Sequence, residues 1–587
     1  MRGTLGAEAR GSTAIDEDAP SAGGPGRWML ERPWLLCIVP VALLVVMAWQ
    51  HRWVGDDAFV YFRVVKQLEA GHGPVFNVGQ RVEATTSPLW LMMLFVADVI
   101  APLRLEWISV LLGMSLAASG LVFAQRGAWL ALGHTDRRRL IVPFGALIVA
   151  ALPPMWDFST SGLETGLCFA WLGACFWALA VRYDRHRSDP TAARTRPPAW
   201  LCILIGLGPL VRPDFAIYSA TFIVAMLVID PGENWADRAR ALIAVFVVPV
   251  ASELFRMGYY ATLVPNTALA KESGRAYWHQ GWEYLRNYDH PYRLWFPLLV
   301  VATVVGVETR LALRAKDRCW VALAGAPVIG GLAHALWVVR VGGDFMHARF
   351  LLPATFAVLL PVSVLPMRGW HWIPTVPIVA WAIICALSFR VALGGQNTID
   401  DERRYWQTQT GHSYPVVMND FRATAGFKNG TRSRTLLASG AHVALAPVVY
   451  PPPELAPLAP RVHAPVVIQV GTVGVSGYRA PLDVEVLDAL GLADPLASRL
   501  RILKRGRPGH EKALLGLWVL ARVTNSNDTS VAAARRALGC GGLHELLVAT
   551  TGPLSFTDVF RNMFEAPHLT SLRFSGEATI DEAAFCK

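Results

Sequence analysis

The chain has 587 residues, of which 53% are hydrophobic and only 17% are charged. Soluble domains carry about 25% charged residues, so this composition excludes an ordinary soluble protein and indicates that most of the chain lies in lipid. The net charge of +10 does not require nucleic acid as a partner, because the basic residues cluster in short segments between apolar runs. That pattern is typical of the cytoplasmic side of a membrane protein.

The chain begins with a segment rich in glycine, alanine, serine and acidic residues. We expect residues 1–32 to form a disordered cytoplasmic tail, because they offer too little apolar surface to order themselves. The apolar run that follows has no small-residue cleavage site and leads directly into charged residues. We therefore interpret it as a signal-anchor helix and not as a cleavable signal peptide.

Apolar runs that are long enough, or nearly so, to cross about 30 Å of hydrocarbon predict about eleven transmembrane helices. They lie near residues 33–49, 107–124, 140–153, 162–181, 199–211, 215–229, 240–255, 292–309, 319–338, 350–366 and 373–390. Basic loops at 182–198, 236–240 and 308–318 are expected to be cytoplasmic, which places the N-terminus inside and the C-terminus outside. We expect a multi-pass protein of the plasma membrane.

One further apolar run, residues 88–101, does not fit this orientation as a span. Asp56 and Asp57, which follow the first predicted helix, are expected outside, and the basic segment 136–139 is expected inside. This allows only an odd number of crossings between them. The run is also bounded by Pro88 and Pro102. We predict a re-entrant or juxtamembrane helix there.

The composition changes after residue 392, where apolar runs shorten and turn residues multiply. Pieces such as HAPVVIQVGTVGV predict strands. We expect a transmembrane catalytic domain over residues 33–392 and a soluble α/β or β-rich domain over residues 393–587 on the outer, periplasmic face. Cys540 and Cys586 then share an oxidising compartment, where a disulfide is the preferred interpretation and two free thiols the alternative.

Two adjacent carboxylates follow the first predicted transmembrane helix. Repulsion between Asp56 and Asp57 raises the proton affinity of one of them, which suits a general base. A divalent-cation site at either residue is equally open, and capping of the helix that follows is a sufficient structural explanation. Arg63 and Lys66 follow within two turns of that helix, near enough to hold a phosphate.

Four further segments place charged or polar groups at membrane ends, on the same side as the acidic pair. Glu164 starts a predicted transmembrane helix, where the helix dipole alone would account for it. Arg212 and Asp214 lie at membrane depth between two short runs, where charges are either functional or paired with each other. Arg349 begins a predicted transmembrane run, and an arginine in that position often only reaches toward the interface. The residues concerned are Arg212, Asp214, Asn266, Lys271, Asp344, His347 and Arg349.

Carboxylates and cations gathered at the outer membrane surface fit one reaction class well. A polyprenyl-phosphate sugar keeps its lipid in the bilayer and its phosphate at the interface, where cations hold it while a carboxylate deprotonates an acceptor hydroxyl. A transporter or flippase for lipid-linked sugar is the alternative class. The chain has no Walker A motif and no internal repeat, which disfavours a pump or a repeat-built transporter.

Several strings also carry a family resemblance: DDAFVYFRVV, GHGPVFNVGQRVEATTSPLW, FSTSGLETGL, LVRPD, LVPNTALAK, GGDFMHARFLLP, LDALGLADPLASRL and RPGHEK. Together they resemble the GT-C superfamily of lipid-phosphate-sugar-dependent glycosyltransferases. The closer likeness is to the actinobacterial terminal β-1,2-arabinofuranosyltransferases, which build mycobacterial arabinogalactan and lipoarabinomannan in cell wall biogenesis. A mannosyltransferase that uses polyprenyl-phosphate mannose is the runner-up within the superfamily.

The resemblance implies a catalytic pair at Asp56 and Asp57 and a second acidic site at Glu164. It also implies a decaprenyl-phosphate arabinofuranose donor, an arabinan acceptor and a carbohydrate-binding-like C-terminal domain. Within the pair we favour Asp56 as the base, with Asp57 orienting it or binding a cation. No cofactor is certain beyond a possible divalent cation.

The choice of phosphate contacts depends less directly on the resemblance. From their charge and position we choose the donor-phosphate contacts, namely Arg63, Lys66, Arg212, Lys271, His347 and Arg349, with Asp214, Asn266 and Asp344 as other cavity residues. A single base promoting direct attack inverts the anomeric centre, whereas a β donor that gives a β linkage requires net retention. The resemblance also marks Asp488 and Asp494 in the C-terminal domain without assigning them a role.

Overall fold

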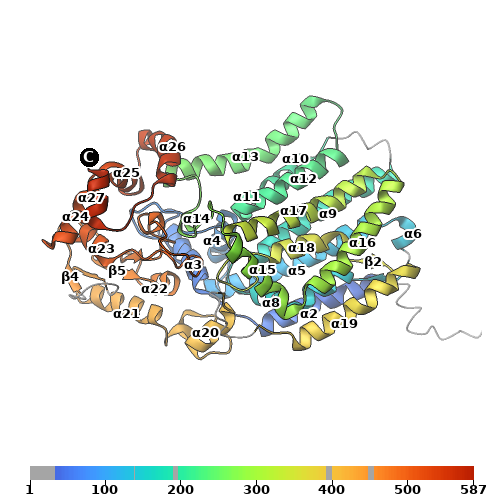
Figure 1. The fold of residues 1–587 in the computed structure, drawn as a ribbon, viewed down its shortest axis with the longest axis horizontal. Helices are drawn as coiled ribbons and strands as arrows, with labels where there is room; N and C mark the ends of the chain where they lie inside the picture. Colours follow the sequence, from blue (N-terminus) through green and yellow to red (C-terminus); the bar gives the residue numbers. More distant parts are fainter. Residues whose placement is uncertain (1–32, 138, 190–195, 392–398, 447–454, 587) are drawn as a thin grey trace, which may run out of the picture.

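The structure is a computed structural model that describes residues 33–137, 139–189, 196–391, 399–446 and 455–586. Long helices lie side by side in one half of the molecule, and a small sheet with surrounding helices forms the opposite end (Figure 1). The predicted N-terminal tail, residues 1–32, lies outside the described residues, as does the predicted domain boundary at residue 393.

Six helical segments among the described residues are long and apolar enough to cross a membrane. They are α5 (Leu105–Ala131), α9 (Thr165–Ser188), α13 (Trp235–Tyr260), α16 (Trp295–Arg314), α17 (Arg318–Val341) and the segment Gly369–Ser388, which ends in α19 (Trp372–Ser388). The prediction of a helical multi-pass membrane protein is therefore confirmed.

Shorter apolar helices occupy most of the remaining predicted runs. These are α2 (Ile38–Gln50), α4 (Pro88–Ile100), α10 (Ala199–Gly206), α11 (Gly208–Val211), α12 (Ala216–Ile229) and α18 (Leu352–Leu359). The total of eleven crossings stays a prediction. At 13 residues, α4 is about 20 Å long, short of the hydrocarbon thickness.

Two of the predicted runs contain short strands. The run 140–153 contains strand β1 (Ile141–Val142), the eight-residue helix α7 (Phe144–Ala151) and the start of α8 (Pro153–Phe158). The run 350–366 ends in strand β2 (Leu365–Pro366), which pairs antiparallel with β1. Because α7 is buried almost completely against its neighbours, it does not need the length of a lipid-facing span.

Glycines allow α5 and α9 to pack closely against each other. A Cβ atom on Gly166 of α9 would lie 2.1 Å from the carbonyl oxygen of Gly113 in α5, and one on Gly173 would lie 2.4 Å from that of Gly120. Only glycine permits this backbone approach, which is a common way for membrane helices to associate. The contact fixes the start of α9, where Glu164 lies.

The C-terminal domain is α/β and not β-rich. Its sheet has the order β4-β3-β5-β6, formed by Leu455–Pro457, Val443–Leu445, Val466–Val470 and Glu485–Asp488, with β3, β5 and β6 parallel and β4 antiparallel. The strand expected to continue through HAPVVIQVGTVGV stops at Val470, and helix α22 (Val473–Arg479) follows. A parallel neighbour requires such a crossover.

Helices cover the rest of this domain and connect it to the bundle. They are α20 (Glu402–Thr410), α21 (Ala425–Ala438), α23 (Gly516–Val523), α24 (Thr529–Leu538), α25 (Gly541–Thr550), α26 (Phe556–Ser571) and α27 (Ala578–Phe585). Three helices of the membrane half contact it: α3 (Asp56–Glu69), α13 and α14 (Asn266–Ala270). The domain therefore meets the bundle where the candidate residues gather.

Cys540 and Cys586 form a disulfide in the structure, with Cα atoms 5.1 Å apart. The bond closes a loop with a sequence separation of 46 and fastens α27 to the start of α25. We expect the paired replacement Cys540→Ser and Cys586→Ser to lower the stability of the C-terminal domain by about 4 kcal/mol, from chain entropy. Thermal unfolding with and without reductant tests this, since reductant should lower the Tm of the wild type alone.

Candidate functional site

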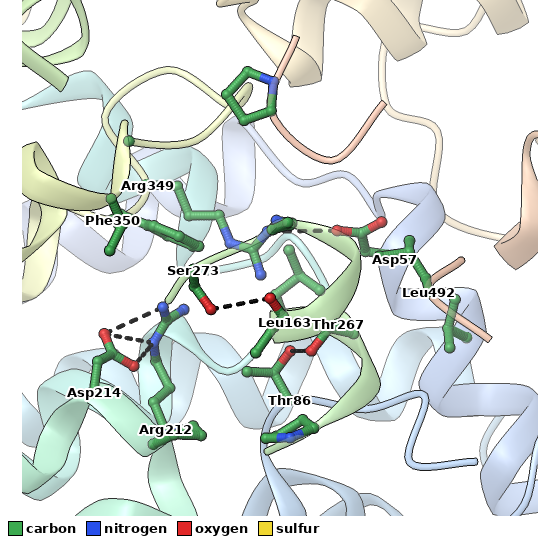
Figure 2. Close-up of a pocket in the computed structure, with 18 of the residues that line it drawn as sticks. Asp57, Thr86, Leu163, Arg212, Asp214, Thr267, Ser273, Arg349, Phe350 and Leu492 are labelled. Carbon is green, nitrogen blue, oxygen red and sulfur yellow. Dashed lines mark hydrogen bonds and ion pairs between the residues drawn. The ribbon is translucent and has the colours of Figure 1, made fainter. Parts of the chain in front are cut away.

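A cavity of about 120 Å³ opens where the bundle, the loop before α18 and the C-terminal domain meet. The charged lining residues are Asp57, Arg212, Asp214, Lys271, Arg349 and Arg505 (Figure 2 shows four of them), and the neutral polar ones include Tyr61, Thr86, Thr267 and Ser273. Four cations therefore face two carboxylates across the lining.

Asp57 brings a carboxylate into this cavity from the first turn of α3. Its Oδ2 atom lies 3.5 Å from Nη1 of Arg349, an ion pair that joins positions far apart in the sequence. Val60 and Tyr61 line the cavity beside it, because residues three and four positions further along share a helix face. One face of α3 thus forms a wall of the cavity.

Asp56 points elsewhere, toward the C-terminal domain. Its carboxylate accepts the backbone N–H groups of Val475 at 2.7 Å and Gly474 at 3.1 Å. Burial raises the pKa of Asp56 to about 7, against the lowering effect of the Val475 N–H, and the charge of Asp57 contributes less. The expectation that Asp56 is the base does not fit this geometry, which favours Asp57.

Arg349 is the centre of a buried charge network. It lies 3.4 Å from Glu164 and 3.6 Å from Asp344, in addition to its contact with Asp57. Lys271 contacts Asp344 at 3.0 Å. Buried charges need such partners, and here the partners fix the cations at the cavity wall.

Arg212 holds the other side of the same network. It lies 2.9 Å from Glu164 and 3.0 Å from Asp214, which in turn contacts His334 at 2.7 Å. The ring of Phe350 lies 4.4 Å from the guanidinium carbon of Arg212. Glu164 itself is buried behind the lining, so its position suits orienting two arginines more than contacting a substrate.

Two predicted phosphate contacts lie outside the cavity. The Arg63 guanidinium is fully buried and donates to the carbonyl oxygens of Phe76 at 2.8 Å, Gly477 at 2.5 Å and Val484 at 2.8 Å. Lys66 is paired with Asp98 at 2.7 Å. The prediction for Arg63 and Lys66 is therefore corrected: both belong to the face of α3 turned away from the cavity lining.

His347 and Asn266 are also engaged outside the lining. The ring of His347 is buried between Tyr292, 3.1 Å from Nε2, and Asn287, 2.5 Å from Nδ1. Asn266 donates to the carbonyl oxygens of Gly491 at 2.7 Å and Leu492 at 3.1 Å. It thereby holds a loop of the C-terminal domain whose Leu492 side chain forms part of the cavity wall.

The same loop explains the two aspartates marked by the resemblance. Asp488 accepts the N–H groups of Leu490 and Ala493, and Asp494 accepts those of Leu496 and Ala497. Both carboxylates stabilise the local backbone, as aspartate commonly does in turns. They shape the wall without reaching the cavity.

Arg505 is a lining residue that sequence reasoning missed. It comes from the C-terminal domain, lies 2.8 Å from Glu511, and stacks its guanidinium 3.8 Å from the ring centre of Tyr277. The nearby string RPGHEK marked the segment but not this residue. The cavity is thus completed by the C-terminal domain.

Metal binding was an open expectation for Asp56 or Asp57. In the described part of the chain, no three His, Cys, Asp or Glu side chains converge as metal ligands would. The oxygens of Asp56 are taken by backbone N–H groups, so the adjacent pair does not present two carboxylates to one point. Among the described residues, Asp57 is thus the member of this pair whose carboxylate faces the cavity.

Glu402 of α20 gives the fold a testable pH dependence. Its side chain accepts from Trp406 at 2.9 Å and lies 3.5 Å from Arg507, and burial raises its pKa from 4.5 to about 8. Because the pKa of Glu402 is higher in the folded state than in the unfolded state, this group stabilises the fold fully at pH values below 4.5. The stabilisation is lost as the pH rises through about 8. We expect the Tm of the wild type to fall more between pH 5 and pH 9 than that of Glu402→Gln. Equal slopes would contradict the assignment.

Comparisons with known proteins point to one family. Residues 457–577 match a family model described as the AftB family C-terminal domain. Two curated proteins named terminal beta-(1->2)-arabinofuranosyltransferase are each 33% identical to the chain. The one from Mycobacterium tuberculosis aligns over 92% of this chain and 95% of its own length, and the one from Corynebacterium glutamicum over 81% and 75%.

Two solved structures show weaker likeness. The Archaeoglobus fulgidus oligosaccharyltransferase in its apo form is 10% identical with a TM-score of 0.42, over 80% of this chain and 65% of that one. ArnT from Cupriavidus metallidurans bound to undecaprenyl phosphate is 14% identical with a TM-score of 0.40, over 92% of this chain and 89% of that one.

Proposed function

The chain belongs to the family of terminal β-(1→2)-arabinofuranosyltransferases, and from this membership we propose that it transfers arabinofuranose from decaprenyl-phosphate arabinose to an arabinan. The acceptor is the arabinan of arabinogalactan or lipoarabinomannan, and the product carries a terminal β-1,2 linkage. The reaction takes place on the outer side of the plasma membrane, with the N-terminus in the cytoplasm.

The observation that carries this proposal is the meeting of Asp57 with three fixed cations in one cavity. Arg349, Lys271 and Arg212 line the same space as the Asp57 carboxylate. A phosphate-linked donor needs cationic groups for its leaving group, and an acceptor hydroxyl needs a base. No other cluster of named candidates offers both.

In the proposed reaction, the bond between the anomeric carbon and the phosphate oxygen breaks, and a bond to the acceptor oxygen forms. Asp57 takes the proton of the acceptor hydroxyl. Arg349 and Lys271 stabilise the negative charge that develops on the departing phosphate, aided by Arg212. Because the carboxylates around them hold these cations in place, little reorganisation is needed when the charge develops.

Stereochemistry is the part of the proposal that one base does not explain. A β-configured donor that gives a β linkage requires net retention, which needs a second displacement or a front-face route. Asp214 is the other carboxylate of the lining, and it is paired with Arg212 and His334. Determining the anomeric configuration of donor and product by NMR decides whether Asp57 acts alone.

The activity is tested with purified full-length protein, radiolabelled decaprenyl-phosphate arabinose and an arabinan oligosaccharide. We expect label in a product whose new linkage is β-1,2 by linkage analysis. A parallel reaction with polyprenyl-phosphate mannose serves as the donor control. Transfer of mannose without transfer of arabinose would overturn the proposed sugar.

A further inference from the structure

Helix α26 of the C-terminal domain carries an exposed aromatic ridge. Phe556, Phe560 and Phe564 are 78%, 48% and 84% exposed. Their spacing of four residues places the three rings along one side of the helix, and the first two rings lie 5.0 Å apart between centroids. Exposed apolar patches of this kind on an otherwise packed domain mark a surface that contacts something apolar.

The ridge lies at the end of a membrane helix. Helix α26 packs against the last turns of α13 (Figure 1). The Asn562 side chain donates to the Gly258 carbonyl oxygen at 3.0 Å, and a Cβ on Gly258 would lie 2.7 Å from Val559. A second contact joins the far end of α26, where the Thr570 hydroxyl accepts the Leu263 N–H at 2.8 Å. The position of α26 at this end of α13 is therefore fixed.

Helix α13 is among the most lipid-exposed of the spans, because only 22% of its most apolar window is buried. Its exposed apolar side chains continue up to the junction, with Val250, Leu254 and Phe255 each about half exposed. Tyr259 follows near its end and is partly exposed, and tyrosine concentrates at the membrane interface. The aromatic ridge thus starts where the lipid-facing surface of α13 ends.

The remaining sides of α26 fit an interfacial helix. Val559, Asn562 and Ala566 face the protein, whereas Arg561 and His568 are exposed on the side next to the ridge. A helix with one buried side, one apolar side and one polar side can lie in the plane of a membrane surface. Charged side chains there remain in water or meet lipid headgroups.

We propose that α26 is an interfacial membrane anchor, which inserts Phe556, Phe560 and Phe564 into the lipid leaflet next to the C-terminal domain. The partner is the acyl and headgroup boundary of the bilayer and not another protein. The anchor supplies a second attachment of the C-terminal domain beside the cavity contacts. It holds that domain, with Arg505, at a set height above the membrane.

The test places the photoreactive residue p-benzoyl-phenylalanine at Phe560 in the full-length chain, in nanodiscs of phosphatidylethanolamine and phosphatidylglycerol. After irradiation, intact mass spectrometry reports what the residue has captured. We expect phospholipid adducts at a yield several-fold above that of the same residue at Ser530, an exposed position on α24. A second variant at Phe564 repeats the measurement on the same ridge.

Two results would overturn the anchor. Cross-linked pairs of chains in place of lipid adducts would identify the ridge as an interface between copies. Lipid yields at Phe560 and Phe564 no higher than at Ser530 would place the ridge in water. A Tm of each variant close to that of the wild type verifies that the C-terminal domain is folded.

Discussion

Asp57→Asn should reduce turnover by about 10²- to 10⁴-fold, the usual contribution of a positioned general base. The amide cannot take the proton of the sugar acceptor's hydroxyl group. It keeps the size of the carboxylate and can still accept a hydrogen bond from Arg349. We expect little change in the KM for the donor, because the cations of the lining remain. The measurement is arabinose transfer under saturating donor and acceptor.

The neighbouring residue provides the matched control. Asp56→Asn makes the same chemical change one position earlier, on the side of α3 that contacts Gly474 and Val475. It should lower the Tm through the weakened contact and reduce turnover far less than the Asp57 replacement. If Asp56→Asn abolished turnover while Asp57→Asn kept it, the assignment of the base would be reversed.

Arg349→Met should have a combined effect on activity and stability. The residue contacts Asp57, Glu164 and Asp344 at 3.4 to 3.6 Å and is 7% exposed. Loss of one partner from a buried charge network costs about 3–5 kcal/mol, because the opposite charges remain without compensation. We expect a lower Tm and a turnover reduced by at least about 10²-fold, the scale of one lost transition-state contact.

Two further variants separate charge from geometry. Arg349→Lys keeps the charge but cannot reach three carboxylates with a planar group, so it should recover part of the Tm and little of the turnover. Arg501→Met removes an exposed arginine of the C-terminal domain and should leave both unchanged. Normal transfer by Arg349→Met would exclude the proposed phosphate contact.

The apolar runs predicted the helices well, because a membrane helix has to be apolar over most of its length. The sequence also predicted a helix at α4 and charged segments at the ends of the apolar runs. The interruptions at α7 and α18 were not predictable from apolar length. Buried helices and lipid-facing helices have the same composition, so composition does not distinguish them. The packing does: a Cβ on Gly145 of α7 would lie 2.9 Å from the carbonyl oxygens of Leu359 and Val362, which shows that α7 is a buried helix.

The site was predictable in part, and helix geometry explains the failures. With about 100° per residue, Tyr61 lies about 40° from Asp57 around α3, whereas Arg63 and Lys66 lie about 120° and 180° away. Sequence proximity alone had placed those two cations beside the acidic pair. Arg349 and Lys271 were found as charges at membrane ends, but their contacts with Asp57 and Asp344 depend on packing between distant segments. No sequence pattern marked Arg505 as a cavity residue.

Helix α3 makes contacts on two sides, and these contacts together fix its number of residues. Asp56 and Arg63 are seven residues apart, about 20° around the helix, and both bind the backbone at α22, while Asp57 faces the cavity. One residue inserted between positions 57 and 63 would turn the following part by about 100°. Either Arg63 would leave the carbonyl groups around it or Asp57 would leave the cavity. Relatives that keep this chemistry should therefore vary the side chains of this segment more freely than its number of residues.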